Sequence, residues 1–154
     1  MNSSNGLKAS AIISFKRIFQ KIILLISKGA WIPSTQRYKL LRLGGVRIKK
    51  CFIGEGCIFD TIRPDLINIE EGCVITARTI ILSHYINPDG GMFYGEVNIG
   101  KRVFIGVNSV ILGPKNIGDG ALIGAGSVVT KDVPSKQVWA GNPAKFIKER
   151  EISL

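Results

Sequence analysis

The sequence holds little of what metal-dependent enzymes use. His84 is the only histidine, and Cys51, Cys57 and Cys73 form an odd set without a CxxC pair. A single histidine excludes a solenoid enzyme built around a cluster of zinc-binding histidines, so we expect no metal site. Because no segment reads as a secretion signal, we expect the cysteines to be reduced, buried, small apolar side chains.

Long hydrophobic runs are also absent. The longest apolar run near the N-terminus covers residues 22–26 between Lys21 and Lys28, whereas a spanning helix needs roughly 18 apolar residues. The 154 residues are 45% hydrophobic and 21% charged, which is typical of one globular domain with its own core. We therefore expect a cytoplasmic protein without a spanning segment.

Acidic side chains are missing from the first third of the chain. Residues 1–50 contain 11 Lys or Arg and no Asp or Glu, while residues 51–154 contain the other 10 cations and all 11 carboxylates. A basic arm is thus attached to a nearly neutral body. Such an arm suits anionic lipid, nucleic acid or an acidic polymer.

Within this arm, residues 11–28 have the pattern of a basic amphipathic helix. The apolar side chains that recur at helical spacing are Phe15, Ile18, Phe19, Ile22, Leu25 and Ile26. Lysines and arginines lie on the other side. Two interpretations stay open: the helix contacts an anionic membrane, or it packs on the body and covers its exposed end.

A six-residue repeat follows. Aliphatic residues recur at every sixth position, as Ile99, Ile105, Ile111, Ile117, Ile123 and Val129. A glycine follows four of these six positions. This period fits neither a helix nor a long strand, but it fits a short strand joined to a tight corner. Three such segments close a triangular coil, and stacked coils bury a continuous aliphatic column.

The register is interrupted twice and then ends. We expect a small outward loop at residues 60–68 and a projecting loop at residues 85–98, which contain Asn-Pro and Asp-Gly-Gly. Residues 143–152 predict a short C-terminal helix with Pro143 at its first position. The expected organisation is a basic helical arm at 1–43, a mainly β repeat domain at 44–135 and a tail with a short helix at 136–154.

Two stretches resemble a known family. IGDGALIGAGSVVTKDVP at 117–134 and AGNPAKFIK at 140–148 are similar to the left-handed β-helix hexapeptide-repeat acyltransferases, above all the galactoside, maltose and polysaccharide O-acetyltransferases. The resemblance implies a left-handed parallel β-helix, a homotrimer with active sites between subunits, acetyl-CoA as co-substrate and one histidine as general base. Here that residue is His84.

The resemblance also implies the residues that contact acetyl-CoA. They are Gly106, Val107, Gly124, Ala125, Thr130, Lys131, Asn142, Pro143, Lys145 and Lys148. The glycines beside Ala125 allow the pantetheine to approach its backbone, and the lysines offer point charges to the phosphates. Val107 stands where the family often has serine, so one hydrogen bond is lost there.

The acceptor side departs from the galactoside pattern. Galactoside-type members carry an asparagine two coils before the histidine, and residues 54–61 contain none. This departure disfavours a simple galactoside or maltose acceptor. The candidate acceptor contacts are Asp60, Tyr85, Asn87 and Asp89. The basic arm fits an acceptor that is anionic or carried on a membrane lipid.

These expectations combine into one hypothesis. The chain is predicted to be an acetyl-CoA-dependent O-acetyltransferase that modifies a sugar hydroxyl of a cell-surface polysaccharide precursor, with possible peripheral contact with an anionic membrane through residues 1–50. The alternatives are N-acetylation of an amino sugar and a non-catalytic, membrane-associated solenoid scaffold. Nucleic acid is not an expected partner, because the arm lacks a recognised reading module.

Overall fold

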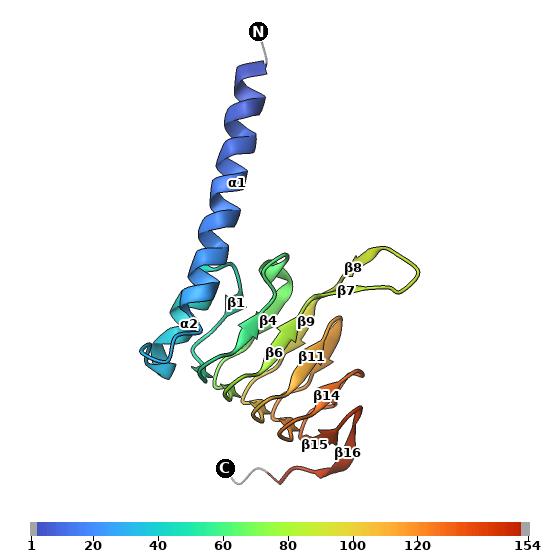
Figure 1. Ribbon diagram of the computed structural model, residues 1–154. Coiled ribbons are helices and arrows are strands. Elements are labelled where there is room, and N and C mark those ends of the chain that lie inside the picture. The colour runs from blue at the N-terminus through green and yellow to red at the C-terminus, as the bar shows by residue number, and fades with distance from the viewer. Residues whose placement is uncertain (1–2, 152–154) are drawn as a thin grey trace.

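The computed structural model describes the backbone of residues 3–151 and the side chains of residues 14–151. Most of these residues form a three-sided prism of stacked coils, and two helices stand at its N-terminal end (Figure 1). Each coil contributes one short strand to each of three parallel sheets, so the six-residue repeat predicted the architecture correctly.

The three sheets run along the three sides of the prism. The first contains β1 (Arg47–Ile48), β4 (Ile67–Ile69), β9 (Val97–Ile99) and β12 (Lys115–Ile117). The second contains β2 (Phe52–Ile53), β5 (Val74–Ile75), β10 (Phe104–Ile105), β13 (Leu122–Ile123), β15 (Gln137–Gly141) and β16 (Ala144–Glu149). The third contains β3 (Ile58–Phe59), β6 (Ile80–Leu82), β11 (Val110–Leu112) and β14 (Val128–Val129).

An aliphatic column fills the prism. The repeat residues Ile99, Ile105, Ile111, Ile117, Ile123 and Val129 are all buried, and their counterparts in the earlier coils continue the column. Glycine follows the inner residue because the next coil leaves no room for a side chain. A Cβ on Gly106 would lie only 2.4 Å from the backbone nitrogen of Ala125. The repeat is thus a packing requirement of the stacked coils.

Two edges of the prism matter for the site. The glycine edge is formed by the turns that join the second sheet to the third, at residues 54–57, 76–79, 106–109 and 124–127. The histidine edge is formed by the connections that join the third sheet to the first, at residues 60–66, 83–96, 113–114 and 130–132. The third sheet separates these two edges.

The outer faces of the sheets differ in polarity. On the first sheet, Asn68, Asn98 and Asn116 form a ladder of side-chain hydrogen bonds of 2.7 and 3.0 Å. On the other two sheets, partly exposed apolar side chains stand in rows along the strands. The row on the second sheet contains Phe52, Val74, Phe104 and Leu122, and that on the third contains Ile58, Ile80, Val110 and Val128.

The N-terminal end of the prism is capped by α2 (Ser34–Leu43). Leu41 is buried against the first coil. The buried guanidinium of Arg37 donates to the carbonyl of Ile53 over 2.9 Å, and the guanidinium of Arg42, a residue exposed to solvent, donates to the carbonyl of Ile48 over 2.7 Å. No coil lies below these carbonyls, so α2 satisfies them and blocks an open sheet edge.

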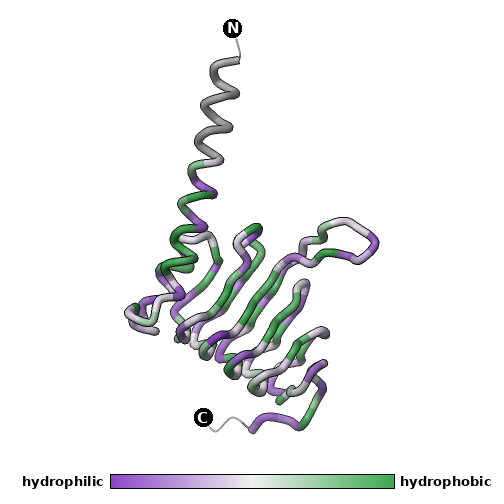
Figure 2. The backbone as a smooth tube through the Cα atoms, viewed as in Figure 1, coloured by the Kyte–Doolittle hydropathy of each residue, from purple (hydrophilic) through white to green (hydrophobic). Residues whose placement is uncertain are grey.

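The first helix, α1 (Ser3–Ile26), extends away from the prism (Figure 1). Leu24 and Ser27, at and just after its C-terminal end, are buried, and Leu24 packs against Gly44. Farther up, apolar and polar residues alternate in bands along the helix (Figure 2). Capping therefore accounts for α2 and the end of α1, and leaves most of α1 standing free.

The predicted C-terminal helix at 143–152 is wrong. Residues Ala144–Glu149 form strand β16, which pairs antiparallel with β15 in a hairpin. The last complete coil has backbone N–H groups to satisfy, and β15 meets this need. The amide of Gly124 donates to the carbonyl of Trp139 over 2.8 Å. The backbone hydrogen bonds gained by pairing in the sheet outweigh the local preference of residues 143–152 for a helix.

Candidate active site

His84 lies at the histidine edge, at the start of β7 (His84–Ile86). This strand pairs antiparallel with β8 (Met92–Tyr94), and the hairpin projects from the prism (Figure 1). The preceding residues Ile81 and Ser83 are buried, so the wall of the prism holds the backbone at this point. The imidazole itself is 19% exposed.

A buried carboxylate orients the imidazole. Asp60, in the connection after β3, has a fully buried side chain whose Oδ2 is paired with Nδ1 of His84. The same carboxylate accepts hydrogen bonds from the amide and the hydroxyl of Ser83, both at 2.9 Å, and from the amides of Ile62 and Arg63 at 2.7 and 3.1 Å. Five donors thus hold Asp60 in one position.

These contacts keep Asp60 ionised. Burial alone raises the pKa of its carboxyl group, but the hydrogen bonds from His84, Ile62, Arg63 and Ser83 together outweigh burial and lower the pKa below its ordinary value. A carboxylate that accepts from Nδ1–H selects the imidazole tautomer whose Nε2 carries the free lone pair. The pair therefore offers a proton acceptor on the exposed side of the ring.

The placement of Asp60 corrects the sequence analysis. We expected this residue to contact the acceptor, but its buried side chain faces His84 and backbone amides instead. The signal for this role was present in the repeat. Because Phe59 pairs with Ile81, the residues that follow them lie at the same edge, one coil apart.

The other candidate acceptor residues lie on the projecting hairpin. Tyr85 stacks on Phe93 at 5.2 Å between ring centroids. Asn87 and Asp89 lie at the tip of the hairpin, where the amide of Asp89 contacts Oδ1 of Asn87 at 3.4 Å. Tyr94 is the hairpin residue nearest to the imidazole in register, since it pairs with His84 and its ring centroid lies 6.4 Å from the imidazole.

Seven of the ten residues expected to contact acetyl-CoA gather around the glycine edge. Gly106 packs against Ala125 of the next coil, and Gly124 lies against Ala140 of β15. The members of this group are Gly106, Val107, Gly124, Ala125, Asn142, Pro143 and Lys145. Within the described residues, neither the amide nor the carbonyl of Ala125 has a hydrogen-bond partner. The exposed backbone of Ala125 can therefore bond an extended chain of amides.

The remaining three expected contacts lie elsewhere. Lys148 pairs with Val138, farther along the β15–β16 hairpin than Lys145. Thr130 and Lys131 are exposed at the histidine edge, after β14. Because β14 and β6 are two strands apart in the third sheet, Thr130 is roughly 10 Å along the prism from the level of His84 at about 4.8 Å per strand.

We compared the chain with known proteins. Residues 96–131 match the family described as the hexapeptide repeat of succinyl-transferase. The chain is 44% identical over 66 residues to the galactoside O-acetyltransferase of Escherichia coli, covering 43% of this chain and 32% of that protein. It is 39% identical over 107 residues to serine acetyltransferase 4 of Arabidopsis thaliana, covering 66% of this chain and 30% of that protein.

Among solved structures, the hexapeptide-repeat acetyltransferase VCA0836 of Vibrio cholerae with acetyl coenzyme A superposes with a TM-score of 0.75. The two are 23% identical, and the match covers 94% of this chain and 92% of that one. Over part of its length, the chain is thus similar to the hexapeptide-repeat acyltransferases. Its fold is the left-handed parallel β-helix of that family, as the resemblance implied.

The match to the family is partial in length. This hexapeptide-repeat chain spans about half or less of the curated relatives that it matches. None of the helices that the structure describes combines the length and hydropathy needed to cross a membrane. Within the same part of the chain, no three histidine, cysteine or acidic side chains come together as metal ligands would.

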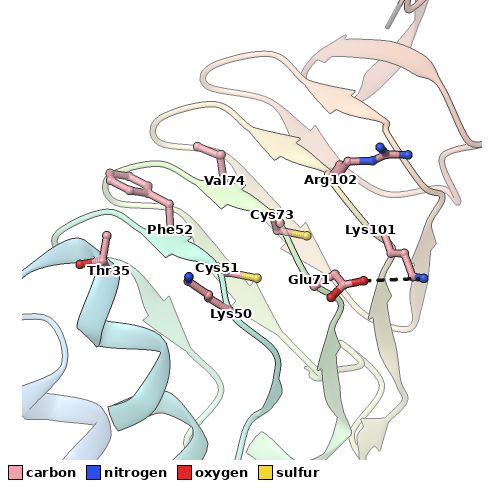
Figure 3. A pocket seen from close by; sticks show the side chains of 10 residues that line it. Thr35, Lys50, Cys51, Phe52, Glu71, Cys73, Val74, Lys101 and Arg102 are labelled. Carbon is pink, nitrogen blue, oxygen red and sulfur yellow. Dashed lines mark ion pairs between the residues drawn. The ribbon is translucent and has the colours of Figure 1, made fainter. Parts of the chain in front are cut away.

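A cavity lies apart from His84. Its volume is about 720 Å³, and it opens at the edge between the first and second sheets. Figure 3 shows Cys51 and Cys73 as neighbours there, to one side of an ion pair of 3.8 Å between Glu71 and Lys101. The three cysteines are buried and unpaired, as expected. The neighbouring Cys51 thiol, together with burial, raises the pKa of the Cys73 thiol, so this thiol is a poor nucleophile.

Proposed function

We propose that this hexapeptide-repeat protein is an acetyl-CoA-dependent O-acetyltransferase that acts on a sugar hydroxyl of a cell-surface polysaccharide precursor. The observation that carries the proposal is the His84–Asp60 pair. It places an oriented imidazole on a rigid edge, with Nε2 directed away from the carboxylate. A hydroxyl group is a poor nucleophile at neutral pH, and a positioned imidazole supplies the base that it needs.

The reaction follows from this geometry. Nε2 of His84 takes the proton of the acceptor hydroxyl as its oxygen attacks the thioester carbonyl. The negative charge of Asp60 stabilises the imidazolium that forms. The tetrahedral intermediate then expels the CoA thiolate, which recovers the proton from Nε2, and the acetyl ester remains on the acceptor. No acyl-enzyme is needed, because no cysteine lies at the histidine edge.

The glycine edge supports a place for acetyl-CoA. The unpaired amide and carbonyl of Ala125 suit the pantetheine amides. Lys145, Lys148 and Lys131 are exposed and offer positive charge for the phosphates. The turn at Asn142 and Pro143, next to this edge, is the proposed site of the adenine ring.

The separation of the two edges supports a homotrimer. His84 and Ala125 stand on opposite edges of the third sheet, so a site that uses both within one chain has to cross the whole sheet. A neighbouring copy brings its glycine edge against the histidine edge directly. The apolar rows on the second and third sheets provide the surface for this contact, because monomers rarely expose such rows.

The location that we propose is cytoplasmic, with peripheral contact at the inner face of the membrane. Along one side of α1, the apolar side chains are between 41% and 72% exposed, and they are Phe15, Ile18, Phe19, Ile22, Leu25 and Ile26. The arm that carries them has 11 cations and no carboxylate. Exposed apolar residues combined with positive charge are typical of helices that lie in an anionic headgroup layer.

The test is release of free thiol from acetyl-CoA by the purified full-length protein with a panel of sugar acceptors. We expect acceptor-dependent release, which His84→Ala lowers by about 10²–10⁴-fold, the usual contribution of a general base. KM for acetyl-CoA should change little. Equal turnover by His84→Ala, or transfer only to amino groups, would contradict the proposal.

A further inference from the structure

A cavity of about 750 Å³ lies between α1 and the histidine edge. Figure 1 shows α1, the connection before β4 and the β7–β8 hairpin all projecting upward from the prism, with α1 at its N-terminal end and the hairpin farther along. The lining residues come from all three elements: Lys16, Arg17, Gln20, Lys21, Thr61, Ile62, Arg63, Pro64, Asp65 and Tyr94. Within the described residues, this cavity is where side chains of the basic arm come close to the surroundings of His84.

The lining is strongly cationic. Lys16, Arg17, Lys21 and Arg63 face a single carboxylate, that of Asp65. Arg63 already binds Asp65 through two hydrogen bonds of 2.9 and 2.8 Å. Among residues 14–151, no ion pair involves the three cations of α1. The cavity therefore carries a formal charge of +3 with no internal counter-ion for α1.

The cavity adjoins the catalytic pair. The guanidinium of Arg63 lies 5.8 Å from the ring centroid of Tyr94, which pairs with His84 across the hairpin. The amide of Arg63 donates to Asp60, and its carbonyl accepts from Ser83 over 2.9 Å. Arg63 and Tyr94 are thus direct neighbours of the His84–Asp60 pair. A ligand held by these two side chains lies next to the imidazole.

The basic face of α1 is directed toward this cavity. Gln20, between the cations, is half-buried, and a Cβ on Gly45 would meet its Nε2 at 2.9 Å and Pro64 at 3.1 Å. Phe15, Ile18, Phe19, Ile22, Leu25 and Ile26 of α1 lie on the opposite face of the helix and are exposed. The positive charges thus face a concave site and do not simply cover the solvated side of the helix.

We propose that this cavity binds a phosphoryl or diphosphoryl group attached to the acceptor sugar, and so selects phosphate-linked sugars as acceptors. The inference rests on the proposed function and names its acceptor class. A terminal phosphoryl group carries nearly two negative charges at neutral pH, and a diphosphate that links a sugar to another group also carries two. Either ligand offers more negative charge to the three unpaired cations of α1 than a single carboxylate would. Lysine and arginine are the side chains that bind phosphate by charge-assisted hydrogen bonds.

The first experiment measures binding without turnover. Inorganic pyrophosphate is titrated by calorimetry into full-length protein saturated with CoA, so that the CoA phosphate contacts are already occupied. We expect Lys16→Gln/Lys21→Gln to weaken pyrophosphate binding about tenfold or more, equivalent to about 1.4 kcal/mol. The matched control Lys28→Gln/Lys39→Gln removes two lysines of the same arm outside the cavity and should change it less than twofold.

The outcomes separate this inference from the proposed function. Absent pyrophosphate binding, or equal loss in both double variants, overturns the cavity assignment whatever the enzyme does. His84→Ala should lower thiol release as stated above and still bind pyrophosphate. Thermal unfolding of each double variant checks the fold, and Arg17→Gln, which should also weaken pyrophosphate binding, provides a second, milder test.

The second experiment identifies the source of the phosphate. Turnover is compared for a neutral methyl glycoside, a nucleoside diphosphate sugar and a lipid-linked sugar diphosphate in vesicles. We expect both phosphate-linked acceptors to have a KM at least tenfold below that of the neutral one, with Lys16→Gln/Lys21→Gln removing the difference. Preference for the vesicle-borne acceptor assigns a lipid source, and preference for the nucleotide sugar a soluble one. Equal KM for all three contradicts the inference.

Discussion

The chemistry that we propose for this protein depends on a pair of residues 24 positions apart in the sequence. His84 is easy to identify from the sequence because it is the only histidine in the chain. Asp60 is one of 11 carboxylates and has no local motif. Its distinction is full burial with five hydrogen-bond donors, of which the three on Ser83 and His84 come from the next coil and meet Asp60 only through the stacking of coils. We interpret Asp60 as a positioning residue that sets the tautomer and orientation of the imidazole.

At this scale, Asp60→Asn tests the pair. An amide can donate to Nδ1, which favours the wrong tautomer, so we expect kcat to fall by about 10²–10⁴-fold while KM for acetyl-CoA changes little. Steady-state kinetics over a range of pH measure both, and the pH profile of kcat should change as well. Asp119→Asn, an exposed carboxylate on another edge, is the matched control. An unchanged kcat and pH profile would assign Asp60 to structure alone.

The same substitution changes how stability depends on pH. The pKa of Asp60 is lowered in the folded protein, so its contribution to stability is present above the ordinary carboxyl pKa and disappears as pH falls through the lowered value. Denaturant unfolding between pH 3 and pH 7 should therefore show a loss in the wild type, below roughly pH 4, that is smaller in Asp60→Asn. If the free energy of unfolding of the wild type and of Asp60→Asn changed with pH in the same way, the carboxylate of Asp60 would not be ionised in the folded protein.

At the scale of elements, the two N-terminal helices divide the roles that the basic arm suggested. α2 caps the first coil, and two of the arm's cations, Arg37 and Arg42, serve as hydrogen-bond donors to its open carbonyls. α1 covers almost nothing with its apolar face. The two interpretations of the arm, as a cap and as a surface for an outside partner, thus apply to different helices.

Vesicle flotation tests the outward face of α1. Ile18→Glu/Ile22→Glu places charge at two exposed apolar positions, so we expect the variant to lose most of its binding to anionic phosphatidylglycerol vesicles. Neutral vesicles should bind the wild type weakly, because the arm's positive charge contributes to attraction. Phe146→Glu/Ile147→Glu, equally exposed on β16, is the control. Equal flotation of both variants, or a change in oligomer mass instead, would argue against a membrane surface.

At the scale of the whole molecule, the proposed site is divided between two edges that one chain keeps apart. The expected pantetheine contacts lie at the glycine edge and the proposed base lies at the histidine edge, with the third sheet between them. A closed ring of three copies joins unlike edges of neighbours through one repeated contact. The polar asparagine ladder then leaves the first sheet to face solvent.

Subunit complementation tests this arrangement. His84→Ala and Ala125→Trp are each expected to be inactive, the second because a bulky side chain fills the groove at the glycine edge. Co-assembled at random, they should regain about a quarter of the wild-type activity if each site takes one edge from each of two copies. Sedimentation equilibrium should give about three times the 16.8 kDa chain. No recovery in a confirmed mixed trimer, or a monomeric mass, would place the site within one chain.

The repeat made most of the fold predictable. A residue such as Ile105 contacts the same inner column in every coil, so its period is visible in the sequence and predicts its burial. The tail was not predictable in this way. Residues 143–152 have a local helix pattern. They form a strand because β15 satisfies the amides of Gly124 and its neighbours, and the following residues pair with β15.

The sequence by itself determined two kinds of feature: those that recur with the six-residue repeat and those that have no alternative in the chain. They are the aliphatic column, the glycine turns, the buried cysteines and the one histidine. These features depend on spacing within a coil or on the absence of an alternative. What only the tertiary structure decided is which unlike residues meet: Asp60 with His84, Arg37 with the carbonyl of Ile53, and the cations of α1 with Arg63 and Tyr94. Such contacts join different coils or a helix to a coil, and no periodicity in the chain encodes their distance.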